Sequence, residues 1–206
     1  MQKFEQLVPG CVYHLYNRGI NGGKIFLEDT NYEYFLRLYF KYMDRFSDTL
    51  ALCLLPNHFH FLIKVHDPLR AYSCWKTRRG EPAFSQKIPD PSKTISNLFN
   101  AYAQAFNRRN QRTGALMERP FKRKIVDSEL YFTRLVYYIH NNPVKHGLSR
   151  EMTDYPWSSF SSIISFSPGK IKKDVVIGYF GSRSEFVDFH RQHHDLSEIY
   201  AMIREF

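Results

Sequence analysis

The sequence predicts an α+β fold, and two observations support this class. Residues 12–17 alternate between apolar and polar side chains, which is typical of a strand. The apolar run 50–55 is followed by the turn pair Pro56-Asn57 and then by residues 58–65, a second strand-like stretch. Two strands joined by a tight turn form a hairpin, so the sheet is at least partly antiparallel. Helical patterns interleave with these strands, which favours α+β over a purely parallel α/β class.

The first helix is predicted from about residue 29 to Asp44, with Asp29 or Thr30 as its N-cap. Its apolar residues recur at helical spacing and are Tyr34, Phe35, Leu38 and Tyr42. Residues 66–93 contain four prolines and little periodicity, so they are predicted to form a long functional or mobile loop.

A second helix is predicted to begin at Ser92 or Thr94 and to end in a basic run before Gly114. Its expected apolar stripe is Ile95, Leu98, Phe99, Tyr102 and Phe106. Residues 121–127 are predicted to form another strand.

A third helix is predicted to start at Asp127 or Ser128 and to be stopped by Pro143. Its expected apolar residues are Leu130, Leu135, Val136, Tyr138 and Ile139. Residues 154–159 are interpreted as a turn into a short helix. One further helical pattern, 185–190, follows Ile171.

Composition limits the class of protein. The chain has 206 residues, 43% of them hydrophobic, which excludes a wholly disordered chain. Its 29 Lys and Arg against 20 Asp and Glu give 29 − 20 = +9, which suggests a polyanionic partner, either a nucleic acid or a membrane surface. No apolar run approaches the ~18 residues of a membrane span, and no secretory signal is visible. The three cysteines lack metal-type pairing and favour a reduced, cytoplasmic setting.

His58 and His60 are the first candidate site residues. Alternate residues of a strand point to one face of the sheet, so both imidazoles project together. Two adjacent imidazoles can hold one divalent metal. The alternative is a pair of half-exposed histidines with no ligand.

Tyr138 and Asn142 are the second candidate pair, because positions four apart on a helix are stacked on one face. A phenol with its ordinary pKa of ~10 needs help from a metal or a base to attack phosphorus. An Asn amide oxygen is an acceptable ligand for Mg²⁺ or Mn²⁺. Tyr137 and Asn141 have the same spacing, so spacing does not choose between the pairs. The alternative is a core tyrosine followed by an Asn that ends the helix.

Basic segments are the third signal. Residues 108–124 hold seven cationic residues against one Glu: Arg108, Arg109, Arg112, Arg119, Lys122, Arg123 and Lys124. Trp75 lies beside Lys76, Arg78 and Arg79 in the long loop. Cations neutralise phosphates and aromatic rings stack on unpaired bases, which predicts nucleic-acid binding. A solvated helix end and a charged loop would give the same pattern.

Four segments in a fixed order resemble one known family. They are Leu-Pro-Asn-His-Phe-His at 55–60, Gly-Ala-Leu-Met-Glu-Arg-Pro-Phe-Lys at 114–122, Tyr-Ile-His-Asn-Asn-Pro-Val-Lys-His-Gly at 138–147 and Tyr-Pro-Trp-Ser-Ser at 155–159. Tyr-Asn-Arg-Gly at 16–19 and Ile-Phe at 25–26 also fit. The chain resembles the REP-associated tyrosine transposases, which are HUH-type single-tyrosine enzymes of the IS200-like group. The resemblance covers roughly residues 10 to 165.

The resemblance implies a ferredoxin-like, HUH endonuclease-type domain with an antiparallel sheet flanked by helices. This domain would span residues 1–165, and a helical extension of unknown role would span 166–206. By position in the motifs, Tyr138 matches the nucleophile, while His58, His60 and Asn142 match the ligands of Mg²⁺ or Mn²⁺. That match selects Tyr138 over Tyr137.

The family cleaves and rejoins single-stranded DNA near hairpins through a 5′-phosphotyrosine, so the resemblance implies that activity here. It implies a single-stranded or hairpin DNA partner, no membrane, a cytoplasmic, nucleoid-associated location and a homodimer as one assembly the protein could form. The alternatives are a DNA-binding regulator without cleavage activity, an HUH replication initiator, and a hydrolase of small phosphate esters.

Overall fold

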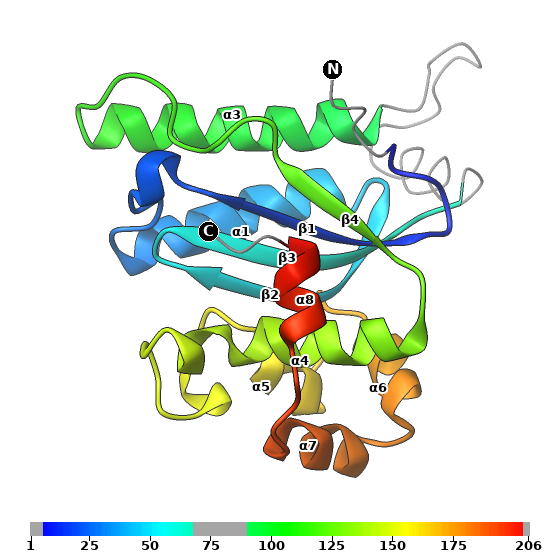
Figure 1. Ribbon diagram of the computed structural model, residues 1–206. Coiled ribbons are helices and arrows are strands. Elements are labelled where there is room, and N and C mark those ends of the chain that lie inside the picture. Colours follow the sequence, from blue (N-terminus) through cyan, green and yellow to red (C-terminus); the bar gives the residue numbers. More distant parts are fainter. Residues whose placement is uncertain (1–5, 68–89, 204–206) are drawn as a thin grey trace.

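The computed structural model describes residues 6–67 and 90–203, and these ranges build one four-stranded antiparallel sheet. Its strands are β1 (Val12–Arg18), β2 (Ser47–Leu55), β3 (His58–Val65) and β4 (Lys122–Val126). They lie side by side in the order β2-β3-β1-β4 (Figure 1). The predicted α+β class, the hairpin and the strand near 121–127 are therefore confirmed.

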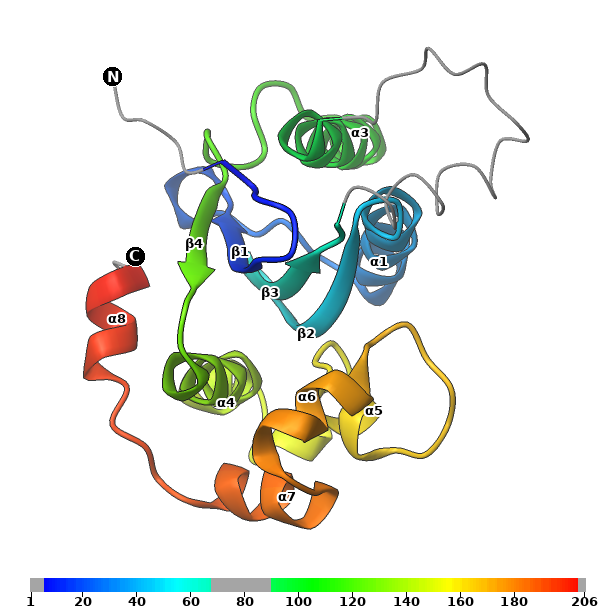
Figure 2. The ribbon, with the colours of Figure 1, turned by 90° about the vertical axis from the view of Figure 1, so that its right-hand side faces the viewer.

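Helices cover both faces of the sheet, as Figure 2 shows. One face carries α1 (Asp29–Met43) and α3 (Pro91–Arg109), and the other carries α4 (Glu129–Lys145). The two central strands therefore lie between two layers of helices. Buried residues dominate β2 and β3, as expected for strands without a solvated face.

Strand β3 sends alternate side chains to opposite layers. Phe59 and Phe61 face α1, where their ring centroids lie 5.2 Å from Phe35 and 3.9 Å from Tyr39. His60 faces the other way, toward α4. The same period-two pattern therefore supplies the aromatic core and a polar cluster beneath α4.

The N-termini of the helices contradict two sequence predictions and confirm a third. The N-cap of α1 is Glu28, not Asp29 or Thr30, and the side chain of Asn31 reaches back to the amide of Leu27 instead. The N-cap of α3 is Asp90, not Ser92 or Thr94, because the Asp90 carboxylate accepts a hydrogen bond from the Ser92 amide. Ser128 caps α4 as predicted.

The predicted stop of α4 at Pro143 is wrong. The helix continues to Lys145, and a Schellman motif ends it: the amide of Gly147 bonds to the carbonyl of Val144 and the amide of Leu148 to that of Pro143. Gly147 has φ +67°, the left-handed conformation that this motif requires. Glycine, and not the missing N–H of proline, therefore ends this helix.

The residues predicted for the apolar face of α4 are buried, except for the first of them. Leu135, Val136, Tyr138 and Ile139 are buried, whereas Leu130 is 60% exposed. A helix turns 100° per residue, so Leu130 points almost opposite to Phe132, which heads the buried stripe two residues later.

The C-terminal part contains more helix than its pattern predicts. After α5 (Phe160–Ile164), the described residues form α6 (Lys173–Phe180), α7 (Arg183–Arg191) and α8 (Ser197–Ile203). The sequence pattern indicated only the region of α7, because α6 and α8 are two turns long and show little periodicity. These helices pack against α4 and β2, and the division of the chain at residue 165 stays a prediction. In the described ranges, no helix has the length and apolarity needed to cross a membrane.

A buried chain of polar groups fastens α7 to α4. The carbonyl of Phe186 can only accept, so His190 donates to it from Nδ1 at 2.7 Å. His190 Nε2 then accepts from His140 Nδ1 at 3.0 Å, and His140 Nε2 accepts from the Ser159 hydroxyl at 2.8 Å. Both imidazoles are neutral in this arrangement. Burial lowers the pKa of His140 well below its ordinary value and that of His190 to about 4.

The hydrogen-bonded chain through His190 and His140 predicts that the protein loses stability in mild acid. In the unfolded chain an imidazole takes up a proton near pH 6.5, but folded His190 resists protonation down to about 4. The contribution of His190 to the free energy of unfolding is therefore complete above pH 6.5 and is lost as the pH drops toward 4. His190 alone accounts for about 3 kcal/mol, at about 1.4 kcal/mol per pKa unit. Urea unfolding at the two ends of this window measures the change.

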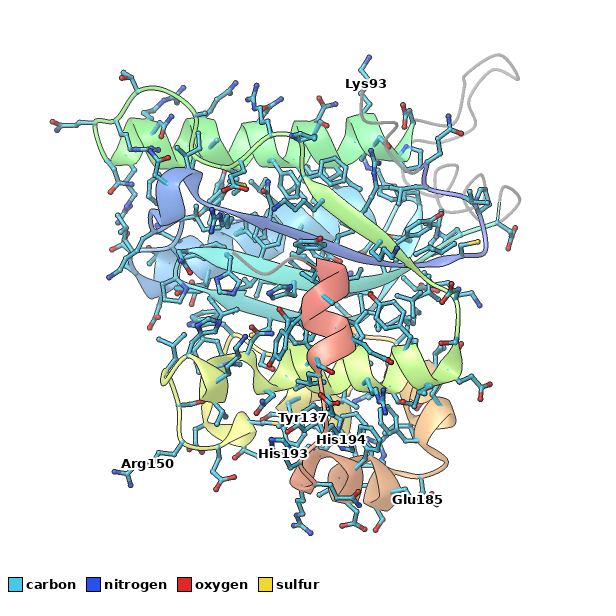
Figure 3. All side chains as sticks on the ribbon, in the orientation of Figure 1. Lys93, Tyr137, Arg150, Glu185, His193 and His194 are labelled. Atoms are coloured by element: carbon cyan, nitrogen blue, oxygen red, sulfur yellow. The ribbon has the colours of Figure 1, made fainter. Side chains whose placement is uncertain are left out.

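A His190→Phe variant separates this contribution from those of other buried histidines. It should be less stable than wild type above pH 6.5 and show a shallower pH dependence. His193→Gln is the matched control, because His193 is an exposed histidine close by (Figure 3). An unchanged pH dependence in His190→Phe would contradict the assignment.

Candidate active site

The two predicted histidines lie side by side on β3 beneath α4. The ring centroids of His58 and His60 are 5.2 Å apart. His58 Nδ1 bonds to Asn57 Oδ1 at 2.7 Å, and His60 Nδ1 bonds to His14 Nε2 at 3.0 Å. Both histidines are buried. The structure thus brings them together with a third imidazole that the sequence analysis did not select.

Tyr138 lies on the face of α4 that covers these histidines. Its ring centroid is 5.2 Å from that of His60 and 6.3 Å from that of His14. Tyr137 points elsewhere, and its ring is 4.6 Å from His194 below α4 (Figure 3). Of the two tyrosines that spacing left open, Tyr138 is therefore the one beside the histidine pair.

Asn142 lies one turn after Tyr138 on the same face. Its Nδ2 donates to the Tyr138 carbonyl at 2.8 Å, which fixes the amide and turns Oδ1 away from that carbonyl. His146, one further turn along, has its ring 5.2 Å from His58. This end of α4 therefore lies over the histidine end of β3.

Two buried atoms of this cluster fit a divalent cation. His60 Nε2 and Asn142 Oδ1 make no hydrogen bond within the described part of the chain. Unsatisfied buried polar atoms are costly, and both of these can offer a lone pair to a metal. Burial, together with His14, His58, His146 and Lys145, lowers the pKa of His60 well below its ordinary value, which keeps its imidazole neutral as metal binding requires.

The ligand set needs the amide oxygen. Among residues 6–67 and 90–203, no three His, Cys, Asp or Glu side chains are grouped so that they could hold a metal. A metal site at this cluster would therefore combine imidazole nitrogens with the amide oxygen of Asn142.

Helix α8 covers the tyrosine. Tyr138 is 1% exposed, and the ring centroid of Tyr200 lies 5.8 Å from its own. Lys145 Nζ sits 4.0 Å above the Tyr200 ring, and the Tyr16 hydroxyl donates to the Ile203 carbonyl at 3.1 Å. Helix α8 therefore helps to shield the Tyr138 ring from solvent.

The predicted basic residues divide between two faces. On β4, Lys122 pairs with Tyr16 and Lys124 with His14, so both lysines share the face of the histidine cluster. Arg123 lies on the opposite face, where it donates to the Ser92 hydroxyl at 2.6 Å.

The remaining arginines lie along α3 and on the segment that follows it. Arg108 is exposed there, and Arg109 forms an ion pair with Glu28 at 2.7 Å. Arg112 donates to the Ala115 carbonyl and Arg119 to the amide oxygen of Asn100. Trp75, Lys76, Arg78 and Arg79 lie outside the described residues.

A groove of about 710 Å³ separates α3 from the segment 114–123. Several amide and cationic side chains line it, among them Asn17, Lys93, Asn100, Gln104, Asn107 and Arg119. Lys93 belongs to the first turn of α3 and is labelled in Figure 3. Sequence analysis missed the amides because they are spread over two elements and form no motif.

Sequence analysis also missed His14, Tyr16 and Tyr200. A signal existed for the first two: they alternate in strand residues 12–17, so they share a face just as His58 and His60 do. Nothing in the sequence indicated that Tyr200 would fold back onto Tyr138.

No family model matches the chain. A curated protein of Haemophilus influenzae (strain ATCC 51907 / DSM 11121 / KW20 / Rd), named "Putative REP-associated tyrosine transposase", is 26% identical over 113 residues. The match covers 55% of this chain and about 58% of that relative's length.

A solved structure described as a REP-associated tyrosine transposase bound to a REP hairpin has the same fold. It aligns with a TM-score of 0.57 and 19% identity, over 82% of this chain and 89% of that one. The two comparisons confirm the resemblance drawn from the motifs and the antiparallel α+β fold expected from it.

The contacts of α8 predict the accessibility of Tyr138. Deleting residues 197–206 should raise the rate at which Tyr138 is iodinated by roughly tenfold or more, equivalent to lowering a local opening free energy by about 1.4 kcal/mol. Tyr200→Ala should have a smaller effect in the same direction. Peptide mass spectrometry measures the label at each tyrosine.

Tyr39 is the internal control, because it is equally buried but lies on the far face of the sheet. It should stay protected in both variants. Equal labelling of Tyr138 in wild type and in the truncated chain would show that α8 does not cover it.

Proposed function

We propose that this chain is a metal-dependent transposase or endonuclease that cleaves and rejoins single-stranded DNA through a 5′-phosphotyrosine. The observation that carries the proposal is the position of Tyr138, beside His60 and one helical turn before Asn142. A phenol next to two buried atoms with free lone pairs suits phosphoryl transfer, because charge develops on both the attacking oxygen and the phosphate.

In the proposed reaction Tyr138 is the nucleophile. Its hydroxyl oxygen attacks the scissile phosphorus, and the bond between phosphorus and the 3′ oxygen breaks. The proton lost by the phenol passes through solvent to the departing 3′ oxygen. The products are a 5′-phosphotyrosine and a free 3′-hydroxyl. A second 3′-hydroxyl can reverse the step, which rejoins DNA without an external energy source. The rigid helix and its packing on β3 hold the tyrosine in place for in-line attack.

His58, His60 and Asn142 would hold Mg²⁺ or Mn²⁺ in this proposal. A bound divalent ion would neutralise the phosphate and orient it for attack. The residues that surround the ligands keep them in the required state. Burial keeps His60 neutral, and the bond from Asn142 Nδ2 to the Tyr138 carbonyl leaves the amide oxygen available.

The basic residues would position the DNA backbone. Lys122 and Lys124 border the histidine cluster on its own face, so they suit phosphates near the cleavage site. The arginines around the end of α3 suit a more distant stretch of the same strand. The solved relative is described as bound to a REP hairpin, so we propose a folded single-stranded hairpin as substrate. Homodimer formation and a cytoplasmic, nucleoid-associated location stay predictions.

The proposal predicts a covalent protein–DNA adduct. Incubation with a labelled hairpin oligonucleotide and Mn²⁺ should produce an adduct that survives denaturing electrophoresis. Tyr138→Phe should reduce it to background, because the substituted ring has no oxygen to form the bond. His58→Ala and His60→Ala should lower its yield strongly.

Tyr137→Phe is the matched control, since it removes the neighbouring hydroxyl on the other side of α4 and should leave the adduct intact. An adduct that persists in Tyr138→Phe would refute this nucleophile. Binding of the hairpin without any adduct in wild type would favour a DNA-binding regulator instead.

The basic surface predicts salt-dependent binding. Lys124→Ala and Arg108→Ala should each weaken hairpin binding and reduce the slope of log K against log salt by about 1, because each side chain neutralises one phosphate. Fluorescence anisotropy over a salt series measures both effects.

Lys41→Ala is the control, because Lys41 is an exposed lysine on the sheet face opposite to Lys124, and it lies at the end of α1 away from Glu28, the partner of Arg109. It should leave the slope unchanged. If Lys41→Ala and Lys124→Ala changed the slope of log K against log salt equally, the assignment of Lys124 to the DNA-binding surface would be contradicted.

A further inference from the structure

We propose that His14 is a positioning residue that orients His60 toward the metal through the hydrogen bond between their imidazoles. The inference rests on the proposed function, since it concerns the ligand set of that site. His14 Nε2 lies 3.0 Å from His60 Nδ1, and neither side chain is exposed to solvent. The bond therefore forms away from competing water.

The strand register brings the two rings together. Strand β1 runs antiparallel to β3, with Tyr16 opposite His60 and His14 opposite Leu62. His14 is thus the diagonal neighbour of His60 on the same face, and their rings stack with centroids 5.1 Å apart. The Tyr16 ring also stacks on His14, with centroids 4.7 Å apart, and its centroid lies 6.1 Å from that of His60. The position of the His14 ring is therefore fixed before any ligand binds.

Packing alone does not account for a histidine at this position. His14 Nδ1 has no hydrogen-bond partner among the described residues. A fully buried imidazole with one hydrogen bond is less favourable for stability than an apolar side chain of similar volume. The one bond that His14 makes goes to a proposed metal ligand, which indicates a role for that bond beyond filling space.

The bond can form with either tautomer of His60, and only one of them suits metal binding. If His60 carries its proton on Nδ1, it donates to His14 Nε2 and leaves the Nε2 lone pair free, and that atom is the one without a partner in the described chain. The other tautomer places a proton on Nε2 and blocks coordination. A metal-ligating histidine normally donates its second N–H to an acceptor that fixes its orientation, and His14 supplies this acceptor.

The test compares Mn²⁺ binding and thermal stability in the full chain. His14→Leu should weaken Mn²⁺ binding, measured by calorimetry, by roughly 10- to 100-fold. Its melting temperature should change little, because the substitution removes one unsatisfied buried nitrogen, His14 Nδ1, and leaves another, His60 Nδ1, without its acceptor. His14→Gln, whose amide oxygen can replace Nε2 as acceptor, should recover most of the affinity.

Each outcome has a defined meaning. Wild-type Mn²⁺ affinity in His14→Leu, or a lower melting temperature with no recovery in His14→Gln, would overturn the positioning role while leaving the proposed function standing. No Mn²⁺ binding by wild type, or unchanged binding in His60→Ala, would overturn the metal site itself and this inference with it.

A second measurement needs no variant. Long-range ¹H–¹⁵N spectra of the Mg²⁺-loaded wild-type protein should show His60 protonated at Nδ1. Protonation at Nε2 would overturn the proposal even if His14→Leu did not fold.

Discussion

The burial of strand β3 between two layers of helices is the constraint on which the rest of the structure depends. A strand with no solvated face must match each alternate side chain to a different layer. Phe59 and Phe61 complete the aromatic core with α1, so the residues that alternate with them along the strand must face α4. His58 and His60 are consequently buried imidazoles, and buried polar groups need partners. His14, Asn57 and the end of α4 provide that setting.

Buried histidines serve two different purposes on the two sides of α4. His140 and His190 form a chain in which each nitrogen has a partner, so it fastens the C-terminal helices to the core. Within the described residues, the cluster around His60 leaves His60 Nε2, His14 Nδ1 and the amide oxygen of Asn142 without a hydrogen-bond partner. A hydrogen-bond network in which every atom has a partner stabilises the fold, whereas one with unsatisfied atoms can use them to bind a ligand. This difference separates the structural histidines from the proposed functional ones.

Much of the arrangement could be predicted from local patterns. Period-two alternation predicted β1 and β3 and the shared face of His58 and His60, and helical spacing placed Tyr138 with Asn142. The stop of α4 at Gly147 is also a local signal, but the sequence prediction relied on Pro143 instead. Two features depended on contacts between distant residues and could not be predicted from local patterns. The bond from His14 to His60 rests on strand register, and the cover by α8 rests on a helix too short to show a pattern. Whether the tyrosine was Tyr137 or Tyr138 needed motif resemblance, because both have the same spacing to an Asn.

The central claim is that His58, His60 and Asn142 hold one divalent cation beneath Tyr138. Anomalous diffraction from crystals of the full chain soaked with Mn²⁺ tests it most directly, because the signal locates the ion without reference to activity. The account predicts one peak within coordination distance of His60 Nε2 and Asn142 Oδ1, with His58 beside it. A well-occupied peak elsewhere, with none at these atoms, would contradict the account.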